Sequence, residues 1–132
     1  MKLSDLFKRM PSAEIKSANR DDVLVKYMGA NFLVSRDKFA EDKGYLVTDL
    51  PVYPIHPTNL REAEKIRKAF KDYELDEVHL HPKQHEAHIH ITKKMELTDV
   101  PAELEKILSI RADLNRSLNR WHPIQKAMKY AH

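Results

Sequence analysis

The segments Val78-His79-Leu80-His81 and His88-Ile89-His90-Ile91 alternate apolar residues with histidines, and a short polar stretch that contains Pro82 separates them. A period of two is typical of β-strands with one face in the core. Because successive side chains of a strand point to opposite faces, the apolar residues predict the buried face and the histidines the other one. The sequence therefore predicts a β-hairpin that carries up to four imidazoles on one face.

Helices and further strands are predicted on both sides of this hairpin. Apolar residues at helical spacing predict one or two short helices in residues 1–20, a helix that begins at Thr58 or Asn59, and a long helix that begins near Pro101 and restarts after Pro123. β-Branched and aromatic residues predict a hairpin from Val23 to Val34 and an extended segment at residues 45–47. This order predicts an α+β fold, in which an antiparallel sheet of about five strands has two longer helices packed on one face.

The composition bounds the class of protein. A chain of 132 residues is the size of one domain, so we expect a single domain over residues 1–132, with an N-terminal helical segment (1–20) and an α+β core (21–132). The chain has no cysteine, which excludes disulfides, thiolate catalysis and iron–sulfur ligation. No apolar run approaches the roughly 20 residues of a membrane span, and the start lacks the apolar core of a secretion signal, so a cytoplasmic location and no membrane partner are expected.

Charge permits one further class of partner. The formal net charge is +3 and the isoelectric point is near 9.0, which is compatible with a nucleic-acid partner and equally with an ordinary solvated surface. With only two glycines, the chain has no glycine-rich phosphate loop.

The histidines of the hairpin are candidate metal ligands. Cross-strand neighbours lie about 5 Å apart at their β-carbons, which allows two or three imidazoles to share one divalent ion at about 2.1 Å. Imidazole suits zinc, manganese, iron, cobalt or nickel. The pattern leaves open an alternative in which the histidines line the solvent face of an amphipathic hairpin and act as a surface or interface.

The stretch from His81 to Ile91 resembles the signature of the HUH endonucleases, a superfamily of relaxases, rolling-circle replication initiators and single-strand transposases named for a His-hydrophobic-His strand. The resemblance implies an HUH-like or ferredoxin-like sheet. It also implies a divalent metal (manganese, magnesium or zinc) held by His81, His88 and His90, with His79 as a possible additional ligand.

The same resemblance implies a nucleophile and a partner. Tyr130 best matches the position of the tyrosine that attacks the scissile phosphodiester of single-stranded DNA, and Tyr27 is the reserve. Two residues depart from the family pattern: Lys83 stands where relaxases often have an acidic residue, and Tyr130 lies two residues from the end of the sequence. Basic side chains that could follow the strand backbone are Lys93, Lys94, Arg111, Arg116 and Arg120.

Other functions stay open at this point. The pairs His56-Pro57-Thr58 and His90-Ile91-Thr92 match the repeated His-x-Thr element of two-histidine phosphoesterases, but His56 stands among prolines rather than in a strand. A cupin-type metal box would need more glycine than this chain has. A non-enzymatic protein of phage or plasmid type that binds nucleic acid or another protein, and a metal-dependent enzyme of small-molecule chemistry, are the remaining alternatives.

Overall fold

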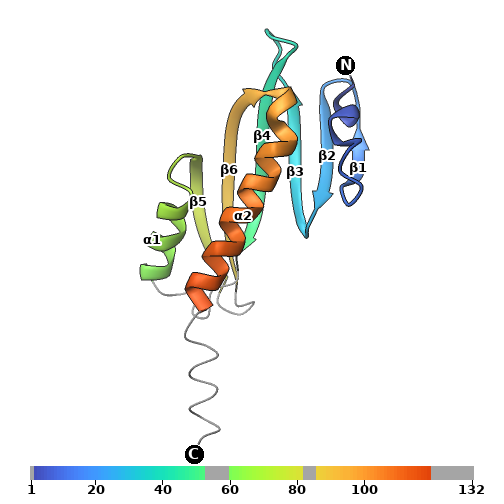
Figure 1. Ribbon diagram of the computed structural model, residues 1–132. Helices are drawn as coiled ribbons and strands as arrows, with labels where there is room; N and C mark the ends of the chain where they lie inside the picture. The colour runs from blue at the N-terminus through green and yellow to red at the C-terminus, as the bar shows by residue number, and fades with distance from the viewer. Residues whose placement is uncertain (1, 53–59, 82–85, 120–132) are drawn as a thin grey trace, which may run out of the picture.

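The computed structural model describes residues 2–52, 60–81 and 86–119, which form one antiparallel sheet with helices on one side (Figure 1). The sheet has six strands in the order β1-β2-β3-β4-β6-β5. The strands are β1 Glu14–Ala18, β2 Asp22–Tyr27, β3 Ala30–Arg36, β4 Lys43–Val52, β5 Glu74–His81 and β6 Glu86–Glu96. The helices are the 3-10 turns η1 Leu3–Phe7 and η3 Leu97–Asp99 and the α-helices α1 Leu60–Ala69 and α2 Val100–Asn119.

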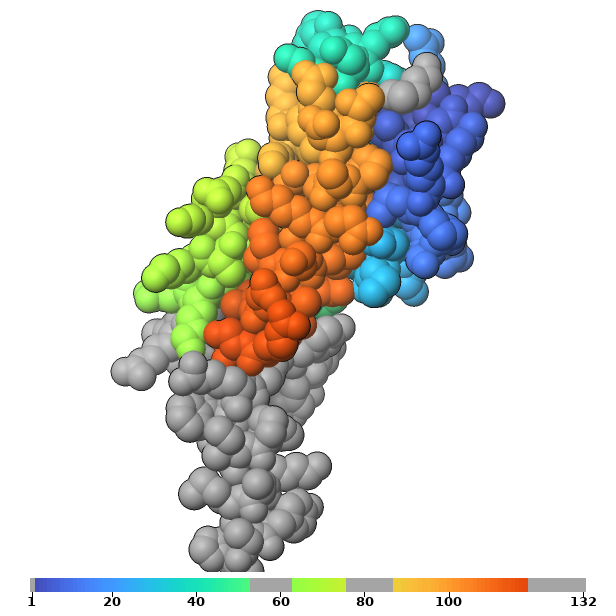
Figure 2. Space-filling view, in the orientation of Figure 1, coloured from blue at the N-terminus to red at the C-terminus, as the bar shows by residue number. Residues whose placement is uncertain are grey.

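The helices form a single layer. The long helix α2 runs across the middle of the sheet, with α1 beside β5 on one flank and η1 against β1 and β2 on the other (Figures 1 and 2). Side chains from all of these helices join one buried cluster with the strands. None of the described helices is long and apolar enough to cross a membrane.

Alternation along the strands explains why one face of the sheet is covered. In β6, Ala87, Ile89 and Ile91 are fully buried, and the residues between them are partly exposed. In β4 the buried positions are likewise every second residue, from Gly44 to Val52. The period of two that the sequence shows is therefore the period of burial.

The opposite side of the sheet, here called the open face, carries the alternate residues, and no described helix packs on it. Strand pairing places these residues in neighbouring rows. The open face comprises Asp22, Leu24 and Lys26 of β2, Asn31, Leu33 and Ser35 of β3, Lys43, Tyr45, Val47, Asp49 and Pro51 of β4, and His88, His90, Thr92, Lys94 and Glu96 of β6.

The predicted α+β class is confirmed, with one strand more than the five expected and a helical layer on one face. The additional strand is β1, which lies in the N-terminal segment expected to be helical; only Leu3–Phe7 forms a helical turn there. All five side chains of β1 are exposed, so no apolar pattern marks it as a strand. Backbone pairing with β2 along the edge of the sheet decides its structure.

Gly44 of β4 packs closely against β3 and the η3 turn. A β-carbon at this position would stand 2.4 Å from the carbonyl oxygen of Ser35 and 2.7 Å from Cδ2 of Leu97. The Ser35 contact is to backbone of the neighbouring strand, which cannot move away without disturbing the β3–β4 pairing. Glycine is therefore required here for close packing.

We expect Gly44→Ala to lower the free energy of unfolding by about 1–3 kcal/mol, the usual cost of overpacking a well-packed site. Urea denaturation followed by circular dichroism measures this. The control is Gly29→Asn, at a turn where φ is +78° and no atom lies within 4 Å of the added β-carbon. Asparagine tolerates this backbone region better than most residues, so the control should lose less stability than Gly44→Ala. Equal midpoints for Gly44→Ala and the wild type would contradict the packing argument.

Candidate functional site

The histidine hairpin forms as the sequence predicts, from β5 and β6. The register places His79 opposite His88 and His81 opposite Glu86. His88 and His90 lie on the open face, and their side chains are 24% and 38% exposed. The side chains of His79 and His81 lie outside the described residues, so for these two predicted ligands the structure gives only the strand register.

An aspartate that the sequence reasoning did not select stands between the two described imidazoles. Asp49 lies opposite His90 on the neighbouring strand β4. Its Oδ1 is 3.1 Å from Nδ1 of His88 and 3.7 Å from Nε2 of His90. The open face therefore brings together a carboxylate and two imidazoles from two strands that are far apart in the sequence.

This cluster has the right donor types for a divalent metal but not the arrangement. Neighbouring donors of a tetrahedral site with bonds of about 2.1 Å lie roughly 3.4 Å apart, a value between the two measured separations. In the described part of the chain, however, no group of three or more histidine, aspartate or glutamate side chains is placed to hold a metal ion. As it stands, Asp49 lies within hydrogen-bond distance of His88 and has His90 as its second neighbour.

Lys94 belongs to a second polar group on the open face. Its ammonium is 3.2 Å from Oδ2 of Asp37 and 5.7 Å from the ring centre of Tyr45. A hydrogen bond from the backbone N–H of Phe39 and a second one from Lys94 lower the pKa of Asp37, and the same ion pair raises the pKa of Lys94. A cation, a carboxylate and an aromatic ring thus lie side by side at the end of β4 and β6 away from the histidines.

Lys93 points to the other side of the sheet, into the helical layer. Its ammonium donates a hydrogen bond of 2.8 Å to Oε1 of Glu103 on α2 and lies 5.1 Å from the ring centre of Tyr73. Burial raises the pKa of Glu103, but the hydrogen bond and charge of Lys93 outweigh this, so the pKa lies below its ordinary value. Burial also raises the pKa of the Tyr73 hydroxyl.

The remaining predicted basic residues lie on α2. Arg111 donates a hydrogen bond of 2.8 Å to the carbonyl oxygen of Met28 at the β2–β3 turn, and Arg116 pairs with Asp113 within the helix. Arg120 lies outside the described residues. The described members of the predicted track are therefore divided between the helical layer and the open face, where only Lys94 accompanies the histidines.

The two candidate nucleophiles differ in what the structure says of them. The Tyr27 hydroxyl donates a hydrogen bond of 2.5 Å to Oε1 of Glu105 on α2, which raises its pKa. This places Tyr27 on the helix-covered side, with the sheet between it and His88 and His90. Tyr130 lies outside the described residues.

Comparison with protein-family models, with curated proteins and with solved structures finds no match to this chain.

The Lys93–Glu103 pair predicts a dependence of stability on pH. Because the pKa of Glu103 is depressed in the folded state, its contribution to stability is present above the unfolded-state pKa and is lost as the pH falls through the folded-state value. We expect Glu103→Gln to lower the free energy of unfolding by about 1–3 kcal/mol at neutral pH and to flatten its decline below about pH 5. Urea denaturation at a series of pH values tests this, with exposed Glu64→Gln as the control. A parallel pH profile for Glu103→Gln and the wild type would show that the pair adds nothing.

Proposed function

We propose that this chain is a binding protein that takes single-stranded nucleic acid on the open face of its sheet. The observation that carries the proposal is the composition of that face: two imidazoles, lysine ammoniums and an exposed tyrosine ring on a surface that no described helix covers. Bases of an unpaired strand bind proteins by stacking on aromatic rings, and the phosphates bind cationic groups. The proposal includes a cytoplasmic location, in keeping with a sequence without cysteine.

The dimensions of the open face suit several nucleotides. Six strands spaced about 4.8 Å apart span roughly 24 Å, and the five residues from Tyr45 to Asp49 span about 13 Å along β4. The aromatic ring and the histidine cluster stand at opposite ends of that stretch of β4. A single strand can contact both ends at once, whereas the faces of paired bases in a duplex are already stacked on neighbouring base pairs and are not available to a protein ring.

Charged side chains of both signs lie on the open face, where Lys26 and Lys94 are accompanied by Asp22 and Asp49. Lys26 on β2 and Lys94 on β6 flank an apolar row formed by Leu24, Leu33 and Val47. His88 and His90 add ring N–H groups that donate hydrogen bonds to phosphate or base oxygens. The apolar row gives the bases a surface, and the cations lie where a backbone on either side of the bases would pass.

We expect Tyr45→Ala to weaken binding of a short fluorescent oligothymidine about fivefold or more, because it removes one base–aromatic stack. Fluorescence anisotropy at fixed salt measures the dissociation constant. Tyr45→Phe is the matched control, since it retains the ring and should bind as the wild type does.

Lys26→Gln should reduce the slope of log affinity against log salt by about 0.7, the value for one phosphate contact on a single strand. If neither Tyr45→Ala nor Lys26→Gln changes the dissociation constant or its salt dependence, the strand binds at another surface.

A second candidate function is the metal-dependent nicking of single-stranded DNA that the HUH resemblance implies. The specific observation in its favour is the proximity of Asp49 to His88 and His90, which supplies a carboxylate beside two imidazoles. A bound divalent ion would supply charge stabilisation at the scissile phosphate. Because the described residues are not arranged as a metal site, we derive no step of the reaction through such an ion.

Metal content decides this second candidate. If it holds, untagged protein supplemented with manganese or zinc should retain about one equivalent after dialysis, and the His88→Ala/His90→Ala double variant should retain none. Elemental analysis gives the stoichiometry. Retention that is equal in the wild type and the double variant would remove these histidines from the metal-site hypothesis, and absence of metal in both would remove the nicking function.

A further inference from the structure

Two adjoining hollows lie at the end of the sheet where the β1–β2 turn meets the β3–β4 connection. The first encloses about 760 Å³ and is lined by Lys2, Leu3, Ser4, Ala18, Asn19, Arg20, Asp21, Arg36, Asp37, Lys38 and Glu41. The second opens toward the aromatic end of the open face and is lined by Asp21, Asp22, Ser35, Arg36, Asp37, Lys38, Phe39, Tyr45 and Lys94. Because they share Asp21, Arg36, Asp37 and Lys38, the two form one groove, here called the Arg36 groove.

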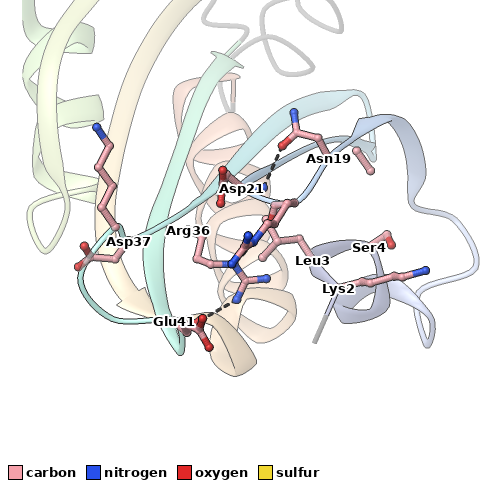
Figure 3. Close-up of a pocket in the computed structure, with 11 residues that line it drawn as sticks. Lys2, Leu3, Ser4, Asn19, Asp21, Arg36, Asp37 and Glu41 are labelled. Carbon is pink, nitrogen blue, oxygen red and sulfur yellow. Dashed lines mark hydrogen bonds between the residues drawn. The ribbon is translucent and has the colours of Figure 1, made fainter.

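Arg36 holds the walls of this groove together. Its Nη1 donates a hydrogen bond of 2.7 Å to the carbonyl oxygen of Glu41, and its Nε donates one of 3.4 Å to that of Arg20. Its backbone N–H donates a further bond of 2.7 Å to the carbonyl oxygen of Asp21. Figure 3 shows Arg36 in the middle of the lining residues, between Asp21 and Glu41. One side chain thus ties the β1–β2 turn to the β3–β4 connection, so the groove is formed before any ligand binds.

One end of the groove is suited to a phosphate group. Its basic lining residues, Lys2, Arg20, Arg36 and Lys38, outnumber its acidic ones, Asp21, Asp37 and Glu41. Asp37 is already paired with the ammonium of Lys94 at 3.2 Å, which offsets one of the three negative charges. Guanidinium and ammonium groups are the usual protein partners of phosphate oxygens, and four residues that carry them line this end of the groove.

The other end offers flat apolar surface. Phe39 is 97% exposed, and Tyr45, which lines the same hollow, is 39% exposed. The Phe39 backbone is held by a hydrogen bond of 3.0 Å from its N–H to Oδ1 of Asp37. A nearly bare phenyl ring on a fixed backbone contributes nothing to the core, and it presents a stacking surface for a planar base.

We propose that the Arg36 groove is a binding site for a nucleoside phosphate, with the base against Phe39 and Tyr45 and the phosphate among the basic residues around Arg36. The inference rests on the proposed function only for the source of the ligand. A nucleotide of a bound single strand and a free mononucleotide present the same chemistry to the groove, and the experiment separates them.

The test titrates adenosine 5′-monophosphate, adenosine and inorganic phosphate separately into the isotope-labelled full chain. Amide shifts in the NMR spectrum locate the site, and calorimetry gives the affinity. We expect the monophosphate to shift amides of residues 19–21 and 36–41 and to bind about tenfold or more tightly than either fragment, since it contacts both ends of the groove. No shift in these segments at about 1 mM monophosphate overturns the proposal.

Variants at exposed positions test the two ends without disturbing Arg36. Phe39→Ala should weaken monophosphate binding about fivefold or more and leave phosphate binding unchanged. Lys38→Gln should weaken the binding of both the monophosphate and inorganic phosphate. Met28→Ala, at an exposed apolar residue of the β2–β3 turn, and Lys65→Gln, on α1 at the far side of the sheet, are the matched controls. If Phe39→Ala and Lys38→Gln bind the monophosphate as the controls do, the groove is not the site.

Titration with a short oligothymidine shows whether the groove takes a nucleotide of a bound strand or a free mononucleotide. Oligothymidine that shifts the same amides makes a bound strand the source of the nucleotide and supports both proposals. Monophosphate binding in the groove without any oligothymidine binding supports the groove as a mononucleotide site and overturns the proposed function. Oligothymidine that binds the open face, while neither it nor the monophosphate shifts the groove, overturns the groove and leaves the proposed function in place.

Discussion

Strands β4 and β6 pair from Lys43 opposite Glu96 to Val52 opposite Ala87, along the middle of the sheet. This pairing sets which residues of the two central strands face the helices and which face the open side. On its helix side it brings Leu50 beside Ile89 to form the surface on which α2 packs, and on its other side it brings Asp49 beside His90. The pairing also brings together the two ends of the segment between β4 and β6, which contains α1 and β5. A shift of one residue in this register would exchange the two faces and expose the core.

Much of the fold follows from patterns within single segments. The alternation around His88 and His90 predicts the strand, its buried face and its pairing with β5, because all three depend on neighbours in the sequence. The stripes of α1 and α2 predict two helices with one buried side each. The period of two also extends from Ile91 to Lys93, and the structure places that lysine on the helix side for the same reason. The sequence pattern carried that information, although the positive charge alone suggested a nucleic-acid contact.

The remainder depends on which segments meet, and local patterns do not contain that information. Nothing in the neighbourhood of Asp49 marks it as the partner of two histidines some forty residues further along the chain; only the β4–β6 register brings them together. Strand β1 has no buried side chain, so backbone pairing with β2 forms it without an apolar signature. The Arg36 groove likewise arises from two connections that become neighbours only in the folded sheet. The candidate ligand sites are therefore less predictable than the elements that carry them.

Because the helices cover only one side of the sheet, its residues fall into two groups on which substitutions have different effects. Residues that face α2 are fixed by packing, and changes among them reduce stability. Their alternates on the open face have no described helix to pack against, so many substitutions there leave the core intact. A lineage could replace the histidines, the tyrosine or the lysines of that face one at a time and acquire a different ligand with the same scaffold. Descendants of this fold would then share a period-two pattern of conserved apolar residues while their exposed alternates diverge.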